Sequence, residues 1–333
     1  MRPKRSAAVA ACLLLLALAL AGAASASNGG FAPPTPASPN AKSITDAYYL
    51  ILGLTAAVFV LVEGALVVFI IRFRNRGRAR SVEGPQIRGN TNLELTWTVV
   101  PVLILAVIAG FVFYKLPGIK NTPSASAATQ LHVTVEAHQF YWQFDYPGGQ
   151  VSINHLVVPR NRVVTLDVVS QDVAHSWWIP SLGGKIDAIP GRTNHTWFQA
   201  KSFGTYHGQC AEFCGLQHAA MKAQVEVVTR GAYNRFLARH FKGSPVLGAE
   251  IFTGVCATCH GMTGQGYIGP AIAGNPILSS ARQLKTLVQN GLAPSTTVNG
   301  MPAVGNDWSD AQIASLVRFF KAHPTLKGSS SGG

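Results

Sequence analysis

The sequence predicts a multidomain membrane protein with three parts: a two-helix transmembrane hairpin, an all-β domain and a small all-α domain. Two long apolar segments early in the chain predict the hairpin. Short stretches of alternating apolar and polar residues predict the β domain, and apolar residues at helical spacing near the end predict the last part. At 333 residues the chain is long enough for two or three domains.

The first 26 residues are typical of a signal peptide. A basic stretch precedes an apolar run over residues 7–22, and the small residues at 24–26 predict a cleavage site. An uncleaved third membrane helix is the alternative, but the apolar run is short and ends in small residues. Cleavage removes Cys12 and leaves four cysteines in two close pairs.

The predicted hairpin covers residues 43–117, with helices near 47–71 and 96–116. Each apolar segment is long enough to cross a bilayer, which takes about 20 residues. By the positive-inside rule the basic loop between them is cytoplasmic. We therefore expect a multi-pass protein of the bacterial plasma membrane, with everything after the hairpin on the outer (periplasmic or extracellular) side. The loop carries six arginines: Arg72, Arg74, Arg76, Arg78, Arg80 and Arg88.

The formal net charge of +13 raises the question of nucleic-acid binding. The excess lies in the first residues, in the arginine loop and in a basic connector over residues 230–245. Across residues 131–229 there are six Lys and Arg against seven Asp and Glu, which is about neutral. We therefore interpret the excess of basic residues as a signal for membrane topology, and we expect no nucleic-acid partner.

A linker over residues 118–130, rich in Ser, Ala and Thr, leads into the predicted β domain at 131–229. The stretches 131–146 and 161–170 alternate, contain many β-branched and aromatic residues, and end at Gly/Pro turns. Short strands separated by turns indicate a β-sandwich or a barrel. The connector after it is predicted to be helical.

The segment 246–325 predicts a small helical domain, followed by a flexible tail over 326–333. Ser309 with Gln312 fits a capping box at the start of its last helix. The domain has too few apolar residues to hold itself together, so we expect a large cofactor in its core. One helical face carries Ile313, Leu316, Val317 and Phe320.

A Cys-x-x-Cys-His motif at residues 256–260 predicts one covalently attached c-type haem. Cys256 and Cys259 would bond the vinyl groups, and His260 would be the proximal iron ligand. A redox dithiol or half of a zinc site is the alternative, but a dithiol does not need the adjacent histidine, and the domain has no second cysteine pair to complete a zinc site. Met301 is our choice for the sixth ligand, because Met262 is too close to the attachment site to reach the far face.

A second cluster combines Cys210, Cys214, His218 and Met221. Two thiolates, an imidazole and a thioether form a soft ligand set that suits copper. A zinc site rarely uses a methionine, and a disulfide between the two cysteines is the other alternative. Because a single blue copper needs one cysteine, the second one indicates two bridging thiolates and a binuclear centre.

Each copper of such a centre needs a histidine, and the loop offers only His218. The other histidine must come from elsewhere in the β domain. On spacing alone the candidates are His175, His195 and His207.

The stretches 172–194 and 204–221 strongly resemble subunit II of cytochrome c oxidase. The resemblance covers roughly residues 43–229. It implies a cupredoxin fold, a Greek-key β-sandwich that holds the binuclear copper centre CuA. With the haem motif in an all-α class I cytochrome c domain, the chain is similar to oxidases whose second subunit carries a fused cytochrome c. The implied ligands of the two coppers are His175, Cys210, Cys214, His218, Met221 and the backbone carbonyl of Glu212.

The same resemblance implies the function. Such a subunit has no oxygen-reducing site of its own and receives electrons from cytochrome c or the upstream cytochrome complex. Its haem reduces CuA, which feeds the haem–copper site of subunit I, where oxygen becomes water. The CuA subunit of a nitric oxide reductase is an alternative that this chain does not exclude. A membrane-anchored copper carrier is disfavoured because the predicted site is closed, and a quinol oxidase subunit lacks the copper ligands.

Two acids carry further expectations from the resemblance. The side chain of Glu212 is expected to help bind magnesium at the contact with subunit I. Glu94 matches an acid at the cytoplasmic start of the second helix through which protons enter, although an acid there also simply favours the helix dipole. Glu63, within the first predicted span, suggests no function from sequence.

One position departs from the family. Phe140 replaces the tryptophan through which electrons usually arrive from a docked cytochrome. A tethered donor could use another path, either through Tyr141 or directly toward the loop over residues 210–221 that carries the predicted copper ligands (the copper loop). Acidic docking residues are few, with Asp172 and Asp187 among them. Both observations favour a donor within the same chain, where tethering replaces docking charge.

Overall fold

We describe the fold from a computed structural model. The chain divides into two units, residues 42–121 and the remainder, and each is described by itself. The signal peptide predicted at 1–26, the tail predicted at 326–333 and parts of the arginine loop and the linker lie outside the described residues. The structure describes residues 32–74, 84, 86, 88–124, 130–294 and 300–323.

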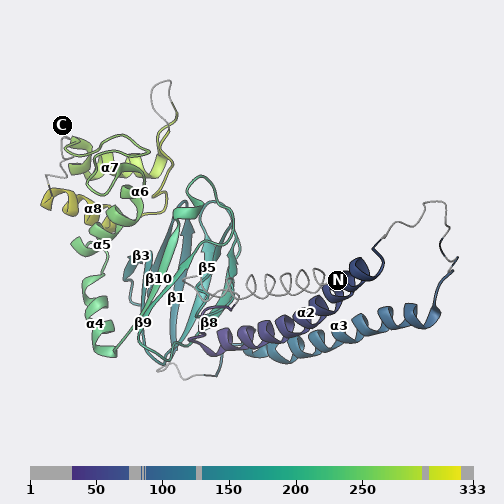
Figure 1. Ribbon diagram of the computed structural model, residues 1–333. Helices are drawn as coiled ribbons and strands as arrows, with labels where there is room; N and C mark the ends of the chain where they lie inside the picture. The colour runs from purple at the N-terminus through teal and green to yellow at the C-terminus, as the bar shows by residue number, and fades with distance from the viewer. Residues whose placement is uncertain are drawn as a thin grey trace, which may run out of the picture. The chain divides into compact units, whose positions relative to one another are not determined.

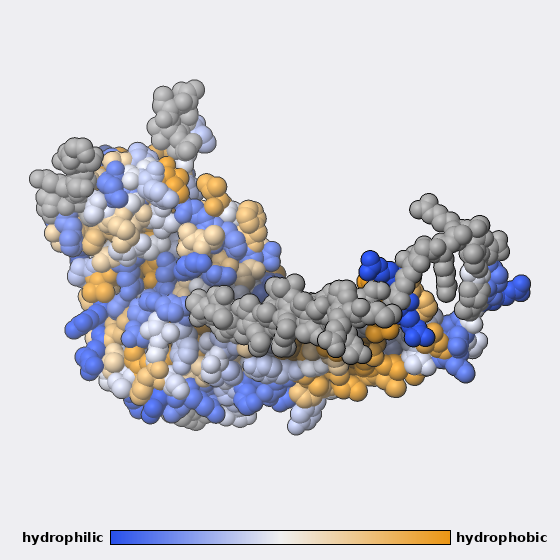
Figure 2. Space-filling view, in the orientation of Figure 1, coloured by the Kyte–Doolittle hydropathy of each residue, from blue (hydrophilic) through white to orange (hydrophobic). Residues whose placement is uncertain are grey.

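The first unit is a pair of long helices that run antiparallel, side by side (Figure 1). Helix α2 spans Pro39–Arg72 and helix α3 spans Thr91–Lys120. Both are long and apolar enough to cross a membrane, and Figure 2 shows hydrophobic side chains gathered over them. Asp46 of α2 bonds Lys115 of α3 at 2.9 Å, which ties the two helices together near one end.

Both helices are longer than the apolar segments that predicted the spans. Helix α3 begins at Thr91 because Asn90 caps it: the Asn90 side chain accepts a hydrogen bond from Leu93 N at 3.1 Å. The Glu94 carboxylate in turn accepts from Asn90 N at 3.3 Å. Apolar periodicity does not reveal such a polar first turn, which capping side chains stabilise.

The larger sheet of the β domain has five strands in the order β3-β2-β1-β5-β8. Strands β1 and β5 pair in parallel, and the other neighbours pair antiparallel. Between β3 and β5 the chain crosses to the second sheet, where it forms β4, and then returns to pair β5 with β1. The strands are β1 (Gln130–His138), β2 (Tyr141–Asp145), β3 (Val151–Ile153), β5 (Val163–Ser170) and β8 (Asn194–Phe198).

The second sheet has the order β4-β10-β9, and a third pair joins β6 to β7. Val133 and Val135 of β1 and Val225 of β10 are fully buried in one core cluster, so the two larger sheets pack face to face. The predicted β-sandwich is confirmed. Its remaining strands are β4 (His155–Pro159), β6 (His175–Trp177), β7 (Ile186–Ala188), β9 (Gly204–Gln209) and β10 (Lys222–Val228).

The C-terminal part is helical, and α5 and α8 cross closely within it. A Cβ atom on Gly248 would lie 2.1 Å from the carbonyl oxygen of Ser315, so only glycine allows this approach. The predicted capping box of Ser309 and Gln312 is confirmed at the start of α8. The elements are α4 (Arg230–Arg239), α5 (Pro245–Ile251), the π-helical turn η3 (Phe252–Cys256), α6 (Ala257–His260), the 3₁₀ turn η4 (Pro276–Ser279), α7 (Ala281–Asn290) and α8 (Asp310–Ala322).

The helical domain shares a hydrophobic core with the β domain. Tyr141, Val151 and Ile153 belong to the same buried cluster as Leu247 and Trp308. The Tyr141 hydroxyl donates to the carbonyl of Val304 at 2.8 Å and accepts from Trp308 Nε1 at 2.9 Å. The two domains are therefore packed together and not only joined by the connector.

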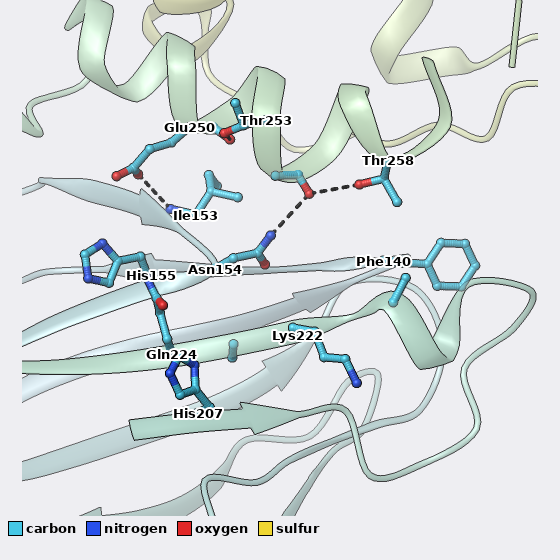
Figure 3. Close-up of a pocket in the computed structure, with 13 residues that line it drawn as sticks. Phe140, Ile153, Asn154, His155, His207, Lys222, Gln224, Glu250, Thr253 and Thr258 are labelled. Carbon is cyan, nitrogen blue, oxygen red and sulfur yellow. Dashed lines mark hydrogen bonds between the residues drawn. The ribbon is translucent and has the colours of Figure 1, made fainter. Parts of the chain in front are cut away.

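A polar hollow of about 460 Å³ lies beside this core. Figure 3 shows its helical wall, with Glu250 and Thr253, facing the strand residues His155 and Gln224. Glu250 accepts from Ile153 N at 3.1 Å, and Asn154 donates to the carbonyl of Gly254 at 3.2 Å. Direct hydrogen bonds thus hold the two domains together on this side as well.

Candidate metal centres

The copper-ligand candidates come from two places in the β domain. His175 opens β6 and is fully buried. Cys210 directly follows β9, and Met221 directly precedes β10. The loop between these two strands carries Cys214 and His218, so antiparallel pairing of β9 with β10 closes the loop into one site.

The two thiols lie at the centre of the cluster, with their Sγ atoms 3.9 Å apart and both free. Cys210 Sγ is 3.8 Å from His175 Nδ1, and Cys214 Sγ is 3.5 Å from His218 Nδ1. Met221 Sδ lies 3.9 Å from Cys214 Sγ. Each thiol thus has its own histidine, and the structure brings all the predicted side-chain donors together.

The backbone at the end of β9 lies very close to the backbone at the end of β6. Gln209 N donates to the carbonyl of Trp178 at 3.2 Å, and Ala211 N donates to that of Ser176 at 2.9 Å. A Cβ atom on Gly208 would lie 2.1 Å from the carbonyl oxygen of Trp178, so this position must be glycine. These bonds fix the loop against β6 and therefore fix Cys210 relative to His175.

Asp172 holds the buried histidine, a role that the sequence analysis missed. Its Oδ1 lies 2.8 Å from His175 Nε2, which leaves Nδ1 facing Cys210. Burial acts against charge on both groups. Burial is the largest single effect, but the hydrogen bond between the two groups, together with Cys210 for His175 and the backbone of Val173 and Gln139 for Asp172, outweighs it. The net result raises the pKa of His175 and lowers the pKa of Asp172. A carboxylate that orients a metal-ligating histidine is common around metal sites, and its sequence signal here is only the short Asp-x-x-His spacing.

The two thiols differ in acidity. Burial raises the pKa of Cys214, and the neighbouring Cys210 raises it further. For Cys210, burial is outweighed by hydrogen bonds with His175 and with the backbone of Glu212 and Ser176, so its pKa is lowered. A cation bound between the two cysteines would therefore be needed to stabilise both as thiolates. The donor set of sulfur and imidazole nitrogen fits soft metal ions.

The other candidates of the β domain lie elsewhere. His195 is exposed and bonds Asp167 at 2.6 Å, and His207 lines the polar hollow of Figure 3. The carbonyl oxygen of Glu212 lies 3.2 Å from Cys210 Sγ, while the Glu212 side chain is exposed. Glu94 has the capping role described above.

The haem candidates line one cavity of about 310 Å³ in the helical domain. Cys256, Cys259, His260 and Met301 are all on its wall. Most of the remaining wall is aliphatic, as a porphyrin requires, and the volume is of the size that holds a ligand. It includes Val255, Ile272, Leu278, Leu284 and Val288.

The proposed proximal histidine is oriented by the backbone. His260 Nδ1 lies 2.7 Å from the carbonyl oxygen of Pro270, which can accept its hydrogen and leave Nε2 for a metal. A Cβ atom on Gly269 would lie 2.9 Å from the ring, so glycine permits this contact. Met301 is held by two backbone hydrogen bonds to Leu292, whereas Met262 is 64% exposed.

The copper loop and the haem motif contact each other. The side-chain amide of Gln217, which is buried, lies 3.3 Å from Cys259 Sγ. Phe140 packs beside the same loop, because a Cβ atom on Gly215 would lie 3.1 Å from its ring. Gln139 donates to the carbonyl of Cys214 at 2.7 Å.

Comparison with known proteins bears on this arrangement. The family described as cytochrome c oxidase subunit II, periplasmic domain, matches residues 149–228. The transmembrane domain of the same subunit matches residues 26–114. Cytochrome c oxidase subunit 2 of Alkalihalophilus pseudofirmus is 32% identical over 252 residues, which are 71% of this chain and 72% of the relative. The chain belongs to the cytochrome c oxidase subunit 2 family. The helical domain matches a third family over residues 244–320, described as cytochrome c oxidase, cbb3-type, subunit III.

Other members of the subunit II family are similar to the same degree. The probable cytochrome c oxidase subunit 2 of Rickettsia bellii is 33% identical over 231 residues, 63% of this chain and 82% of the relative. The crystal structure of the periplasmic domain of subunit II of cytochrome oxidase from Bradyrhizobium japonicum is 33% identical, covers 36% of this chain and 96% of that chain, and has a TM-score of 0.33. Membership of the subunit II family indicates a membrane anchor with an outer β domain, to which a cytochrome c domain is fused.

Proposed function

We propose that this chain accepts electrons from cytochrome c, or from the upstream cytochrome complex, and delivers them to subunit I of a terminal oxidase, which reduces oxygen to water. The observation that carries the proposal is the pair of buried free thiols 3.9 Å apart, each facing its own histidine. A mononuclear blue-copper site takes two histidines but only one cysteine, so it leaves the second cysteine unexplained, and a zinc site rarely uses a methionine such as Met221. The arrangement fits two bridged coppers.

Four of the proposed side-chain ligands of copper are shielded from solvent, and the fifth, His218, is half-buried. Cys210 and Cys214 are 2% and 4% exposed, and His175 and Met221 are fully buried. A copper carrier exchanges its metal with a partner and needs accessible donors. The burial therefore favours a resident centre over the carrier alternative.

The haem is proposed to be held by Cys256, Cys259, His260 and Met301. When bound, the haem and the copper pair each supply one-electron redox chemistry. The chain's own residues orient the ligands: Pro270 accepts from His260, and Asp172 accepts from His175. These two contacts fix the tautomer of each histidine and keep the rings from turning.

The contact between the two sites indicates the path for electrons. Gln217 connects the copper loop to Cys259, and Phe140 lies against Gly215 of the same loop. Tyr141, the other candidate for the path, is fully buried and bonds Val304 and Trp308 of the helical domain. We propose the direct route through the loop, which explains why the usual tryptophan is dispensable at position 140.

Two further roles are proposed for acids. The exposed Glu212 side chain is free to face subunit I and to share a magnesium ion there. Glu94 is proposed as the point where protons enter the complex, in addition to its observed capping of α3. Its exposed position on a helix start is compatible with both roles.

The experiment that tests the function uses the purified oxidase complex that contains this chain. Metal analysis is expected to give two coppers in this chain for each of its c-type haems, after subtracting the metals of subunit I. The electron paramagnetic resonance spectrum is expected to show a seven-line copper signal from one electron shared by two nuclei. A single copper with a four-line signal, zinc, or a Cys210–Cys214 disulfide contradicts the proposal.

A further inference from the structure

A second group of potential metal ligands lies where the β domain meets the helical domain. Glu136 and His138 project from the end of β1, and Asp307 comes from the loop that precedes α8. Their ligand atoms all lie within 4.8 Å of one another. His138 Nε2 is 3.9 Å from a Glu136 carboxylate oxygen and 3.7 Å from one of Asp307.

The histidine nitrogen at the centre of the group lacks a hydrogen-bond partner. His138 is 2% exposed, and its Nε2 has no such partner among the residues that the structure describes. A buried polar atom without a partner destabilises the folded state, because it has lost its hydrogen bonds to water and gained none in return. Both carboxylates face this nitrogen, so a cation between the three groups would satisfy all of them.

The surroundings hold the ligands in place. The His138 ring stacks on Tyr141, with 4.5 Å between centroids and planes 2° apart. Gln143 donates to Glu136 at 2.9 Å, and its own oxygen accepts from Gln312 of α8 at 2.9 Å. Because that oxygen is taken, the amide of Gln143 must present its hydrogens to the carboxylates. Such outer contacts are typical of metal sites.

The electrostatics of the group call for positive charge. Burial raises the pKa of Asp307, and the carboxylate of Glu136 raises it further against the opposing effect of His138. Asp307 nevertheless keeps 29% of its side chain exposed, which leaves an access path for an ion.

We propose that Glu136, His138 and Asp307 bind a divalent transition-metal ion that ties the helical domain to β1. One imidazole and two carboxylates suit zinc better than magnesium or calcium, which prefer oxygen ligands alone. Tetrahedral ligands about 2.1 Å from zinc lie about 3.4 Å apart. The observed 3.7 Å and 3.9 Å differ from this by little, so small rotations of the carboxylates close the site. Water completes the coordination. The proposal does not depend on the copper or haem assignments.

The test uses the full chain, loaded with copper and haem, in detergent. After a chelator wash and dialysis against zinc sulfate, elemental analysis is expected to find one zinc for each polypeptide chain, with the copper-to-iron ratio unchanged. Asp307→Asn and Glu136→Gln are expected to reduce zinc to the background measured without added zinc. Asp307→His, which replaces one zinc ligand with another, is expected to retain it.

Matched controls come from strand β1 and from the first residue of α8, three residues after Asp307. His132→Gln alters an exposed histidine of β1, and Asp310→Asn alters an exposed acid close to Asp307; both are expected to keep the zinc. X-ray absorption at the zinc edge is expected to show nitrogen and oxygen neighbours at about 2.0–2.2 Å.

Three results overturn the proposal: no zinc beyond background in the unaltered chain, as much zinc in Asp307→Asn and Glu136→Gln as in the unaltered chain, or sulfur neighbours at the zinc edge. A variant that misfolds is recognised by its loss of copper or haem, and the remaining variants then decide. Because copper and iron are measured in the same samples, failure of the zinc site is distinguishable from failure of the proposed function.

Discussion

The side-chain amide of Gln217 donates a hydrogen bond to Sγ of Cys259, with 3.3 Å between Nε2 and Sγ. Gln217 stands between Cys214 and His218 in the copper loop, and Cys259 is one of the two cysteines proposed to carry the haem. A single buried side chain therefore joins the two proposed redox centres.

The first prediction concerns this contact. Gln217→Leu keeps the approximate volume but removes the hydrogen bond, so electron transfer from haem to copper is expected to slow several-fold. Both reduction potentials are expected to stay unchanged, because no metal ligand is altered. Rapid-reaction spectroscopy after reduction of the haem measures the rate. Gln199→Leu, which removes a hydrogen bond to Asn161 away from the copper loop, is the control. An unaltered rate in Gln217→Leu contradicts the route.

The second prediction concerns the bridging thiols. Cys210→Ser removes one bridge, so the near-infrared absorption and the seven-line copper signal are expected to disappear. Any copper that remains is expected to be mononuclear. His195→Gln, at an exposed histidine outside the cluster, is expected to leave both signals intact. Survival of the near-infrared band in Cys210→Ser would exclude bridging.

The third prediction concerns the sixth haem ligand. A methionine ligand raises the potential of a haem, so Met301→Ala is expected to lower the haem potential and to remove the methionine charge-transfer band in the red. Met262→Ala alters an exposed side chain and is expected to change neither. Redox titration and absorption spectra give both quantities. The reverse result would make Met262 the ligand.

The fourth prediction concerns Asp172. Asp172→Asn leaves the size of the side chain unchanged but weakens its hold on His175. Loss of such an outer contact typically lowers metal affinity about 10- to 100-fold. Copper retention during dialysis against a graded chelator measures this loss. Asp187→Asn is the control, since Asp187 is exposed. Equal retention in the two variants would mean that Asp172 does not position the ligand.

The fifth prediction concerns pH. Burial raises the pKa of Asp145 to about 6, with a further contribution from Glu136, whereas the ordinary value is 3.8. The folded protein thus binds this proton more tightly than the unfolded chain, and the associated stability is lost as the pH rises from about 4 through 6. A difference of about two pH units in pKa corresponds to about 3 kcal/mol.

The Asp145→Asn variant cannot ionise at this position, so its stability does not fall with rising pH for this reason. In chelator-treated protein its thermal midpoint is expected to match that of the unaltered chain near pH 4, to exceed it increasingly up to about pH 6, and to keep a constant excess above that. Asp310→Asn, at an exposed carboxylate, is expected to show no such trend. Calorimetry measures the midpoints. A constant difference across this pH range would show that Asp145 is not the group responsible.

Local patterns predicted much of this molecule. Alternation and turns predicted the strands, and the spacing of Cys210, Cys214, His218 and Met221 placed four donors in one loop. The assignment of His175 required the family resemblance, since spacing alone left three histidines open.

Contacts between distant segments could not be predicted. The contact of Asp172 with His175 is local, but the sequence predicts Asp172 only as one of few docking acids and does not show that the turn before β6 directs it onto His175. The sequence offers Tyr141 as a candidate for the path of electrons but does not show that it is buried against the helical domain. The pairing of Gln217 with Cys259 depends on how two domains pack, and nothing in either local sequence encodes that.

The shared core around Tyr141, Val151 and Ile153 has a kinetic consequence. A soluble donor must find its acceptor by diffusion, and the rate of that encounter depends on concentration and on ionic strength. Here the helical domain, which carries the proposed donor, shares a buried core with the β domain, which carries the proposed acceptor. If the proposed route holds, reduction of the proposed copper centre is a unimolecular event, first-order at any protein concentration and insensitive to salt.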